Sequence, residues 1–264
     1  MNAAPYRSRH PRVTLVQAET RWADPLANRS NLERLMDRAP DCDLYVLPEN
    51  CTTGFLGDVD CGNRLDPHGD LEWFRVQAAG RAATLAGSIV AAGDDVLYNR
   101  FVLMRPDGDV TIYDKRHRFG FGGEGDRYGA GRQRVRTELF GRRVDLQVCY
   151  DLRFPVWCRN DDAFDLQIFV ANWPKARAAA WRTLLAARAI ENQAIVIGVN
   201  RVGCDGRDIE YPGGSGVWDA LGEPLAGPLE GREGVATVGL DFAALDAVRE
   251  RFPFLADRDA FSIR

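Results

Sequence analysis

The stretch DLQIFVANWPKARAAAWRTLLAARAIENQAIVIGVN, residues 165–200, decides the fold class. It joins two short apolar runs, 165–171 and 194–200, through a longer amphipathic segment, 175–192. Within that segment, apolar and long side chains recur at helical spacing, and most of this stripe is expected to face the core. A buried strand, a helix and a second buried strand in succession are typical of an α/β protein.

The same alternation extends outward along the chain and predicts one α/β domain, 1–264, with layered sheets covered on both faces. Two hairpins are expected at the turns Pro106–Asp109 and Ala220–Glu223. Further helices are expected at 28–39, 68–86 and 241–251. The predicted strands outside 165–200 are 12–18, 43–48, 87–93, 97–105, 109–114, 143–150, 215–220 and 234–241.

Composition excludes several classes of function. The net charge is −4, and no basic block suggests nucleic-acid binding. No 18-residue apolar stretch predicts a membrane span, and residues 1–11 have no hydrophobic signal core, so we expect a flexible extension and a cytoplasmic protein. The six cysteines form no CxxC pair and no zinc spacing, so we expect reduced thiols, no metal and no cofactor. Of 34 basic residues only Lys115 and Lys175 are lysines.

The segment VDLQVCYDLRFP (144–155) carries the first candidate for chemistry. A hydrophobic strand ends at Cys149, and the chain then turns toward a helical piece expected to begin at Pro155. A thiol at the carboxyl end of such a strand opens into the crevice where α/β proteins bind ligands. The following turn can offer backbone N–H groups to an oxyanion. A free cysteine is nevertheless more often a small buried apolar residue, so the segment alone favours a structural role.

The segment LPENCTTGF (47–55) places Glu49 in a similar position, just after another apolar strand. A carboxylate there either caps a local turn or acts as a general base with a raised pKa. Taken alone, the cap is the better interpretation. Cys51 is a rival nucleophile, but the Thr-Thr-Gly loop that follows offers it no positioned partner.

The Gly-rich segment YDKRHRFGFGGEGDRYGAGR (113–132) contains Lys115 but lacks the spacing of a phosphate-binding loop. A solvated loop is the simplest interpretation, and the rarity of lysine argues against it. His117 would serve a Cys–His peptidase, although a lone histidine there is more often a surface residue. Lys115, Glu49 and Cys149 would together form a workable set, in which the carboxylate takes the thiol proton and the ammonium stabilises the oxyanion.

These motifs, in this order, resemble the carbon–nitrogen hydrolase, or nitrilase-related, superfamily. The resemblance rests on LPE (47–49), YDKRH (113–117), CYDLRFP (149–155) and ANWP…ARAIENQ (171–193), within a framework from about 12 to 245. It implies a four-layer α-β-β-α sandwich and a homodimer or larger assembly, with the segment 249–259 reaching toward a partner subunit. It departs from many members at Asn50, where an apolar residue is usual.

The resemblance also implies roles for individual residues. Cys149 matches the nucleophile, Glu49 the general base and Lys115 the oxyanion-stabilising lysine. Glu124 fits a second active-site glutamate by its spacing of nine residues from the lysine, and the backbone N–H of Tyr150 matches a second oxyanion donor.

Within that superfamily, CYDLRFPVWCRN (149–160) and ANWPKARAAAW (171–181) are most similar to the ω-amidase branch. This implies hydrolysis of the terminal amide of a small carboxylate-bearing substrate such as α-ketoglutaramate. The carboxylate needs a cation, for which Arg153, Arg116 and Arg201 are candidates, and Trp173 ends a strand as a pocket wall. Alternatives are nitrile, N-carbamoyl amino-acid or deaminated-glutathione hydrolysis, a non-catalytic small-molecule binding module, and a redox sensor.

Overall fold

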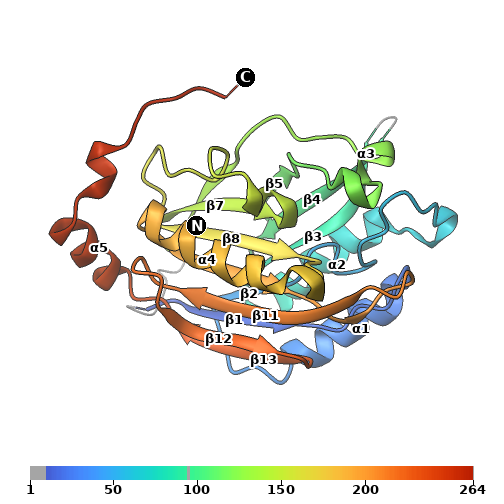
Figure 1. Ribbon diagram of the computed structural model, residues 1–264. Helices are drawn as coiled ribbons and strands as arrows, with labels where there is room; N and C mark the ends of the chain where they lie inside the picture. Colours follow the sequence, from blue (N-terminus) through green and yellow to red (C-terminus); the bar gives the residue numbers. More distant parts are fainter. Residues whose placement is uncertain (1–9, 94–95, 264) are drawn as a thin grey trace.

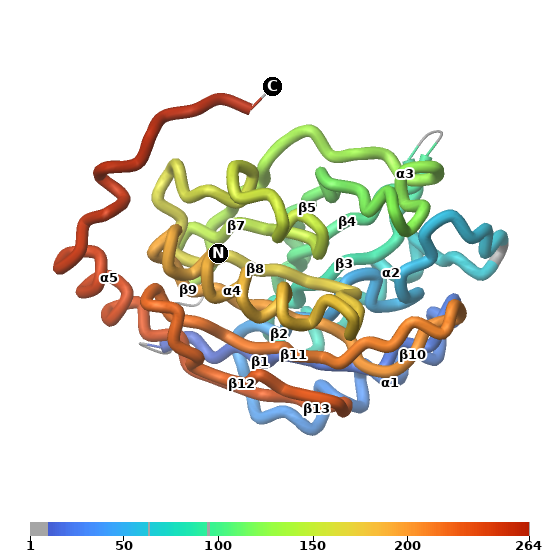
Figure 2. Tube along the Cα trace, in the orientation of Figure 1, coloured from blue at the N-terminus to red at the C-terminus, as the bar shows by residue number. Residues whose placement is uncertain are grey.

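The computed structural model describes residues 10–93 and 96–263, and its elements form two stacked β-sheets with helices outside them (Figures 1 and 2). The first sheet has the strand order β13 (Gly234–Gly239), β1 (Arg12–Gln17), β2 (Leu44–Val46), β3 (Thr84–Ala92), β4 (Leu97–Met104) and β5 (Val110–Asp114). The second has the order β10 (Val202–Cys204), β11 (Glu210–Trp218), β9 (Ile195–Asn200), β8 (Leu166–Ala171), β7 (Arg142–Val148) and β6 (Arg136–Leu139), with β12 (Pro224–Glu230) paired to β11.

Helices complete the layers. Helices α1 (Pro25–Met36) and α2 (Pro67–Arg81) pack against the first sheet, and α4 (Ala178–Asn192) packs against β9 and β11 of the second. The predicted four-layer α-β-β-α sandwich is therefore confirmed. The short α3 (Glu124–Arg127) and α5 (Phe242–Arg251) lie outside these layers (Figure 1). The described residues also form the 3₁₀ turns η1 (Gly62–Arg64), η2 (Gly120–Gly122), η3 (Cys149–Arg153), η4 (Lys175–Arg177) and η5 (Phe254–Asp257).

Strand alternation divides the apolar side chains between the layers. Leu44 and Val46 of β2 face the core between the sheets, whereas Tyr45 joins the core beneath α1 and α2. Leu15 and Val16 of β1 divide in the same way. Because successive side chains of a strand point to opposite faces, an all-apolar strand is what a sheet covered on both sides requires.

Helix α4 shows why residues 165–200 fold as expected. Trp181 and Leu185 are buried against the second sheet. A Cβ on Gly198 of β9 would lie only 2.4 Å from Leu185 Cδ1, so a glycine is needed where the helix meets the strand. The helix ends at Gln193, whose φ of 43° is left-handed.

Several boundaries differ from the predictions. The helix expected at 68–86 ends at Arg81, because Ala82 takes a left-handed φ of 50° and the chain enters β3 at Thr84. The helical piece expected from Pro155 is instead η3, which precedes that proline. Strands β6, β10 and β12 are additional. Of the expected flexible extension 1–11, residues 1–9 lie outside the described residues, and Pro11 O accepts a hydrogen bond from Leu240 N at 2.8 Å.

Both predicted hairpin turns occur, the first between β4 and β5 and the second between β11 and β12. None of the helices within 10–93 and 96–263 has the length and apolar character needed to cross a membrane.

Candidate active site

Cys149 lies directly after β7, where the chain turns from strand into η3. Its φ of 47° is left-handed, a conformation that a residue with a side chain adopts only when its surroundings enforce it. The carboxylate of Asp151 accepts the backbone N–H of Val148 at 3.0 Å and so holds the turn on that side of the cysteine. Cys149 is 9 % exposed and lines a cavity of about 290 Å³. Its thiol therefore faces the cavity although the residue is largely buried.

Glu49 lies just past β2, and its side chain is fully buried. Its Oε1 accepts hydrogen bonds from Lys115 Nζ at 2.8 Å and from Asn99 Nδ2 at 2.7 Å. Its Oε2 accepts the backbone N–H of Asn172 at 2.7 Å. Asn172 follows β8, so this bond connects the carboxylate of the first sheet to the strand beside Cys149 in the second.

Lys115 follows β5 and is 1 % exposed, which excludes the solvated-loop interpretation. Its ammonium lies between two carboxylates, because Glu124 Oε2 is 2.9 Å away on the other side from Glu49. Glu124 begins α3 within the Gly-rich segment, and its Oε2 also accepts the Phe119 N–H at 2.6 Å. The structure thus brings together Cys149, Glu49, Lys115 and Glu124, which come from three separate segments of the chain.

Mutual electrostatics set the protonation states of this cluster. Burial would raise the pKa of Glu49, but the adjacent Lys115 ammonium and the Asn172 N–H hold that pKa below its usual value. Burial would lower the pKa of Lys115, yet the charges of Glu124 and Glu49 hold it well above its usual value. Burial, followed by the Glu49 charge, raises the pKa of the Cys149 thiol far above 9.0. The cluster therefore contains a protonated thiol beside an ionised carboxylate and an ammonium.

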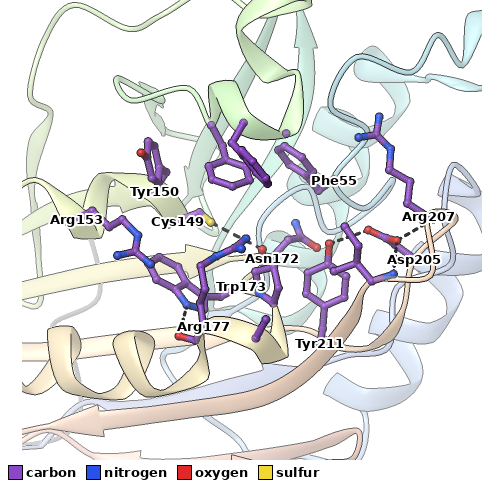
Figure 3. Close-up of a pocket in the computed structure, with 16 residues that line it drawn as sticks. Phe55, Cys149, Tyr150, Arg153, Asn172, Trp173, Arg177, Asp205, Arg207 and Tyr211 are labelled. Atoms are coloured by element: carbon purple, nitrogen blue, oxygen red, sulfur yellow. Dashed lines mark hydrogen bonds between the residues drawn. The ribbon is translucent and has the colours of Figure 1, made fainter.

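The cavity has aromatic walls and three arginines, of which Arg207 pairs with the Asp58 carboxylate (Figure 3). Arg153 lies over the Trp173 ring at 4.9 Å, and Arg177 lies over the Phe119 ring at 5.2 Å. Among the described residues, neither guanidinium forms an ion pair with a carboxylate. Figure 3 shows both side chains reaching into the cavity that contains the Cys149 sulfur. Because guanidinium groups bind carboxylates strongly, these two are free to contact an anionic ligand.

Residues 12–250 match the model of the carbon–nitrogen hydrolase family. The chain belongs to this family. An ω-amidase (YafV) of Yersinia enterocolitica is 44 % identical over 95 % of this chain and 97 % of its own length. The YafV ω-amidase of Escherichia coli K12 is 40 % identical over 96 % of this chain and 98 % of its own. A 2-oxoglutaramate amidase of Paenarthrobacter nicotinovorans is 35 % identical over 94 % of this chain and 89 % of its own.

Solved structures of other members have the same fold as this carbon–nitrogen hydrolase. XC1258 from Xanthomonas campestris, a member with an arsenic adduct in its active site, superimposes with a TM-score of 0.88 and is 45 % identical. That match covers 97 % of this chain and 99 % of the other. A double mutant of the amidase from Nesterenkonia sp. AN1, in complex with acrylamide, gives a TM-score of 0.82 at 25 % identity. Its match covers 96 % and 99 % of the two chains.

Two of the three arginines expected to bind a substrate carboxylate do not line the cavity of this carbon–nitrogen hydrolase. Arg116 packs over the Trp157 ring at 5.5 Å and donates to Gly131 O. Arg201 is fully buried and donates to backbone carbonyls, among them Thr20 O at 2.7 Å. These two predictions were wrong because position after a strand does not reveal the direction of a long side chain. Arg177, which was not predicted from the sequence, takes a place beside Arg153.

The remaining candidates also have defined places. Trp173 is buried and forms part of the cavity wall. His117 binds Asp151 through Nδ1 at 2.8 Å and stacks on Phe154, so it supports the turn after Cys149 and is not a cavity residue. Cys51 lies in the core beneath α1 and α2. Within the described part of the chain, no three His, Cys, Asp or Glu side chains are placed to hold a metal ion.

Proposed function

We propose that this carbon–nitrogen hydrolase is an ω-amidase, which releases ammonia from the terminal amide of a small carboxylate-bearing substrate such as α-ketoglutaramate. The observation that carries the proposal is one cavity that contains the Cys149 thiol, backed by Glu49 and Lys115. The same cavity contains the Arg153 and Arg177 guanidinium groups, which have no carboxylate partner in the part of the chain that the structure describes. The YafV and 2-oxoglutaramate amidase relatives support the same activity.

The first half of the reaction forms a thioester. The raised pKa of the thiol means that Cys149 is protonated at rest, so its proton must pass to Glu49 as the sulfur attacks the amide carbon. Negative charge then develops on the carbonyl oxygen, and the Lys115 ammonium stabilises it. Collapse of the tetrahedral intermediate breaks the C–N bond. Glu49 returns its proton to the leaving nitrogen, and ammonia departs.

The backbone N–H of Tyr150 serves as the second oxyanion donor. Tyr150 is the second residue of η3, and the first N–H groups of a helical turn have no partner within it. Tyr150 directly follows Cys149 and lines the same cavity. Two donors on different sheets therefore flank the carbonyl oxygen, which fixes its position relative to the sulfur.

The second half of the reaction hydrolyses the thioester. Water takes the place of ammonia beside Glu49, gives up a proton to this carboxylate and attacks the acyl carbon. The C–S bond breaks, the sulfur recovers the proton from Glu49, and the free acid leaves. Glu124 holds the Lys115 ammonium through both halves, because its two oxygens lie 3.1 and 2.9 Å from Nζ.

The substrate carboxylate binds between Arg153 and Arg177, each backed by an aromatic ring that limits its conformational freedom. For α-ketoglutaramate, we expect Arg177→Leu or Arg153→Leu to raise KM about tenfold or more, because a charge-assisted hydrogen bond is lost. An uncharged amide such as butyramide should be affected far less. Arg182→Leu is the matched control, since Arg182 lies on α4 and pairs with Glu230 at the surface.

Ammonia release across a substrate panel tests the function as a whole. The panel contains α-ketoglutaramate, succinamate, glutamine, a nitrile and an N-carbamoyl amino acid, with Cys149→Ala as the blank. We expect the highest kcat/KM for the first two compounds. Faster turnover of the nitrile or the N-carbamoyl compound would refute the substrate assignment, and ammonia release by Cys149→Ala would refute the mechanism.

We also propose a homodimer, as the family resemblance implies. The segment after α5 runs along the outside of the molecule (Figures 1 and 2). Its Phe254 side chain is 63 % exposed. Val156 after η3 and Ile190 on α4 are also more than half exposed. A partner subunit would cover such apolar side chains. A monomer by gel filtration at micromolar concentration would contradict this proposal.

A cytoplasmic location is proposed on the state of the cysteines. All six lie in the described part of the chain and all are free thiols. A reducing compartment keeps a thiol nucleophile active, because oxidation removes its reactivity. Fractionation of the native host, with the protein detected outside the soluble cytoplasmic fraction, would contradict this.

A further inference from the structure

Asn99 on β4 occupies a place in the cluster that was not predicted from the sequence. Its side chain is 2 % exposed, and its amide nitrogen donates to two carboxylates at once. Nδ2 lies 2.7 Å from Glu49 Oε1 and 3.0 Å from Glu124 Oε1. The amide therefore spans the same two carboxylates as the Lys115 ammonium, but carries no charge.

The orientation of this amide is fixed by a chain of hydrogen bonds. Ser88 Oγ on β3 donates to Asn99 Oδ1 at 2.8 Å, and the backbone N–H of Asn50 donates to Ser88 Oγ at 2.8 Å. A hydroxyl whose acceptor lone pair is used in this way turns its proton toward Oδ1, so the amide nitrogen must face the carboxylates. Asn50 directly follows Glu49, so this chain of hydrogen bonds begins beside the glutamate whose carboxylate Asn99 contacts.

The charges around the two carboxylates explain why a neutral donor matters. Glu49 faces the Lys115 ammonium, the Cys149 thiol and the Tyr211 phenol, and Glu124 faces Lys115 and the Tyr128 phenol. Two carboxylates share one buried ammonium, and like charges at close range favour protonation of one of them. An N–H donor stabilises the ionised form of Glu49. Among the described residues, Asn99 is the only neutral side chain that donates to both.

We propose that Asn99 is a positioning residue that keeps Glu49 ionised and oriented as the base for Cys149. The inference rests on the proposed function of the cluster. Asn99 does not touch the reacting atoms, and it acts through the two glutamates. It adds a fifth member to a site that otherwise consists of a thiol, two carboxylates and an ammonium.

The test is the pH profile of Asn99→Leu, a substitution of similar size that removes both donated bonds. We expect kcat to fall about tenfold to a hundredfold, with KM changed less than about threefold, since bonds to charged groups are lost and substrate contacts are not. The acid limb of kcat/KM should move up by about one pH unit, because the carboxylate protonates more easily. Ser88→Ala should shift the limb in the same direction by less, since only the amide orientation is released.

Asn160→Leu is the matched control. Asn160 is fully buried and its amide bonds the backbone oxygens of Phe164 and Asn192, away from the cavity. This variant should lose stability and keep the wild-type pH profile. If Asn99→Leu lowers the Tm as Asn160→Leu does and leaves the acid limb in place, its role is structural and the proposal is wrong. If Asn99→Leu does not fold, Ser88→Ala becomes the test. An acid limb of kcat/KM at the wild-type pH in that variant would overturn the proposal.

A second readout separates this inference from the proposed function. Alkylation of Cys149 by iodoacetamide, measured by mass spectrometry of its peptide, needs no substrate and reports proton transfer from the thiol. Its rate in Asn99→Leu should fall and its pH dependence should move upward with the ionisation of Glu49. If the wild-type protein releases no ammonia from the panel, but Asn99→Leu still shifts the pH dependence of alkylation, only the substrate assignment is refuted. An unchanged alkylation profile would overturn the role of Asn99.

Discussion

At the residue scale, Lys115 makes the most specific demand on side-chain chemistry. Its ammonium is buried between Glu49 and Glu124, and an arginine would bring a larger, planar group to this place. We predict that Lys115→Arg lowers kcat about a hundredfold or more, because the oxyanion donor is displaced. Steady-state ammonia release measures the effect.

Lys175 provides the control, as the chain's other lysine. It is exposed, pairs with Glu210 at the surface and does not line the cavity. Lys175→Arg should leave kcat within about twofold of the wild type, as expected for a surface substitution. A Lys115→Arg enzyme as active as Lys175→Arg would show that the buried ammonium does not act on the oxyanion.

The candidate site was only partly accessible from the sequence at this scale. Cys149, Glu49 and Lys115 follow strands in recognisable motifs, and the structure brings them into contact. Asn99 gave no signal, because a polar residue within a strand does not reveal the carboxylate that it meets 50 positions away in the chain. Arg177 was missed for a related reason, since its partner ring on Phe119 comes from a different loop.

At the element scale, the β7–η3 turn depends on the Asp151 carboxylate. Its oxygens accept from Val148 N at 3.0 Å, Tyr113 Oη at 2.7 Å and His117 N at 3.0 Å. We predict that Asp151→Asn lowers the free energy of unfolding by about 2–3 kcal/mol, because an amide nitrogen replaces an acceptor among donors. It should lower kcat about tenfold, since the strained Cys149 backbone loses its support.

Urea unfolding and kcat, measured together, check this prediction. Tyr113→Phe removes one bond to the carboxylate and also leaves Arg116 N and Trp157 Nε1 without the acceptor that they have at 3.1 Å. It should cost about 2–3 kcal/mol in the free energy of unfolding, with a smaller loss of kcat than Asp151→Asn. Equal effects of the two substitutions on kcat would contradict the idea that the carboxylate holds the turn as a unit.

Helix α2 contains another buried carboxylate, Asp70. Burial raises the pKa of this group from 3.8 to about 6. A folded-state pKa above the unfolded one means that the folded protein binds the extra proton, so stability falls as pH rises from about 4 to 6. Asp70→Asn should therefore stabilise the protein at pH 7 by at most about 3 kcal/mol, and by progressively less below pH 6. The Tm of the wild type and of Asp70→Asn, each measured at pH 5 and pH 7.5, tests this prediction. A difference in Tm between the two proteins that is equal at both pH values would contradict the raised pKa.

The elements themselves were predicted where apolar periodicity is strong and missed where it is not. The largely apolar strands β8 and β9 were placed within a residue. Strand β12, with prolines at 224 and 228, has the composition of a loop and is tolerated at the edge of its sheet. The helix expected to reach residue 86 was too long because Ala82–Leu85 suits either structure, and the left-handed Ala82 that ends it comes from tertiary context.

At the scale of the whole molecule, the active site lies between the two sheets. The first sheet supplies Glu49 and Lys115, and the second supplies Cys149 and Asn172. Composition and periodicity predict layered sheets but not which edges meet, so this juxtaposition came from the family resemblance alone. Besides the Asn172–Glu49 contact, one buried polar bridge joins β1 to β11: Gln17 Oε1 accepts from Ser215 N at 3.1 Å and from Ser215 Oγ at 2.8 Å.

Substitution of Gln17 in this bridge should lower the stability of the fold and leave catalysis nearly unchanged. Gln17→Leu leaves the buried Ser215 N–H without its acceptor and Arg232 O without its donor, whereas Ser215 Oγ keeps Asn200 O at 3.1 Å. We therefore predict a loss of about 1–3 kcal/mol in the free energy of unfolding. The apolar core between the sheets includes Val13 of the first sheet and Val199 of the second, and it keeps the two sheets in position. The kcat at 25 °C should therefore change less than about threefold. Thr14→Val, which removes a hydroxyl contact to Thr237 within the first sheet, should cost about 1 kcal/mol. A tenfold fall in kcat for Gln17→Leu with an unchanged Tm would show instead that this single bridge, rather than the core, aligns Glu49 with Cys149.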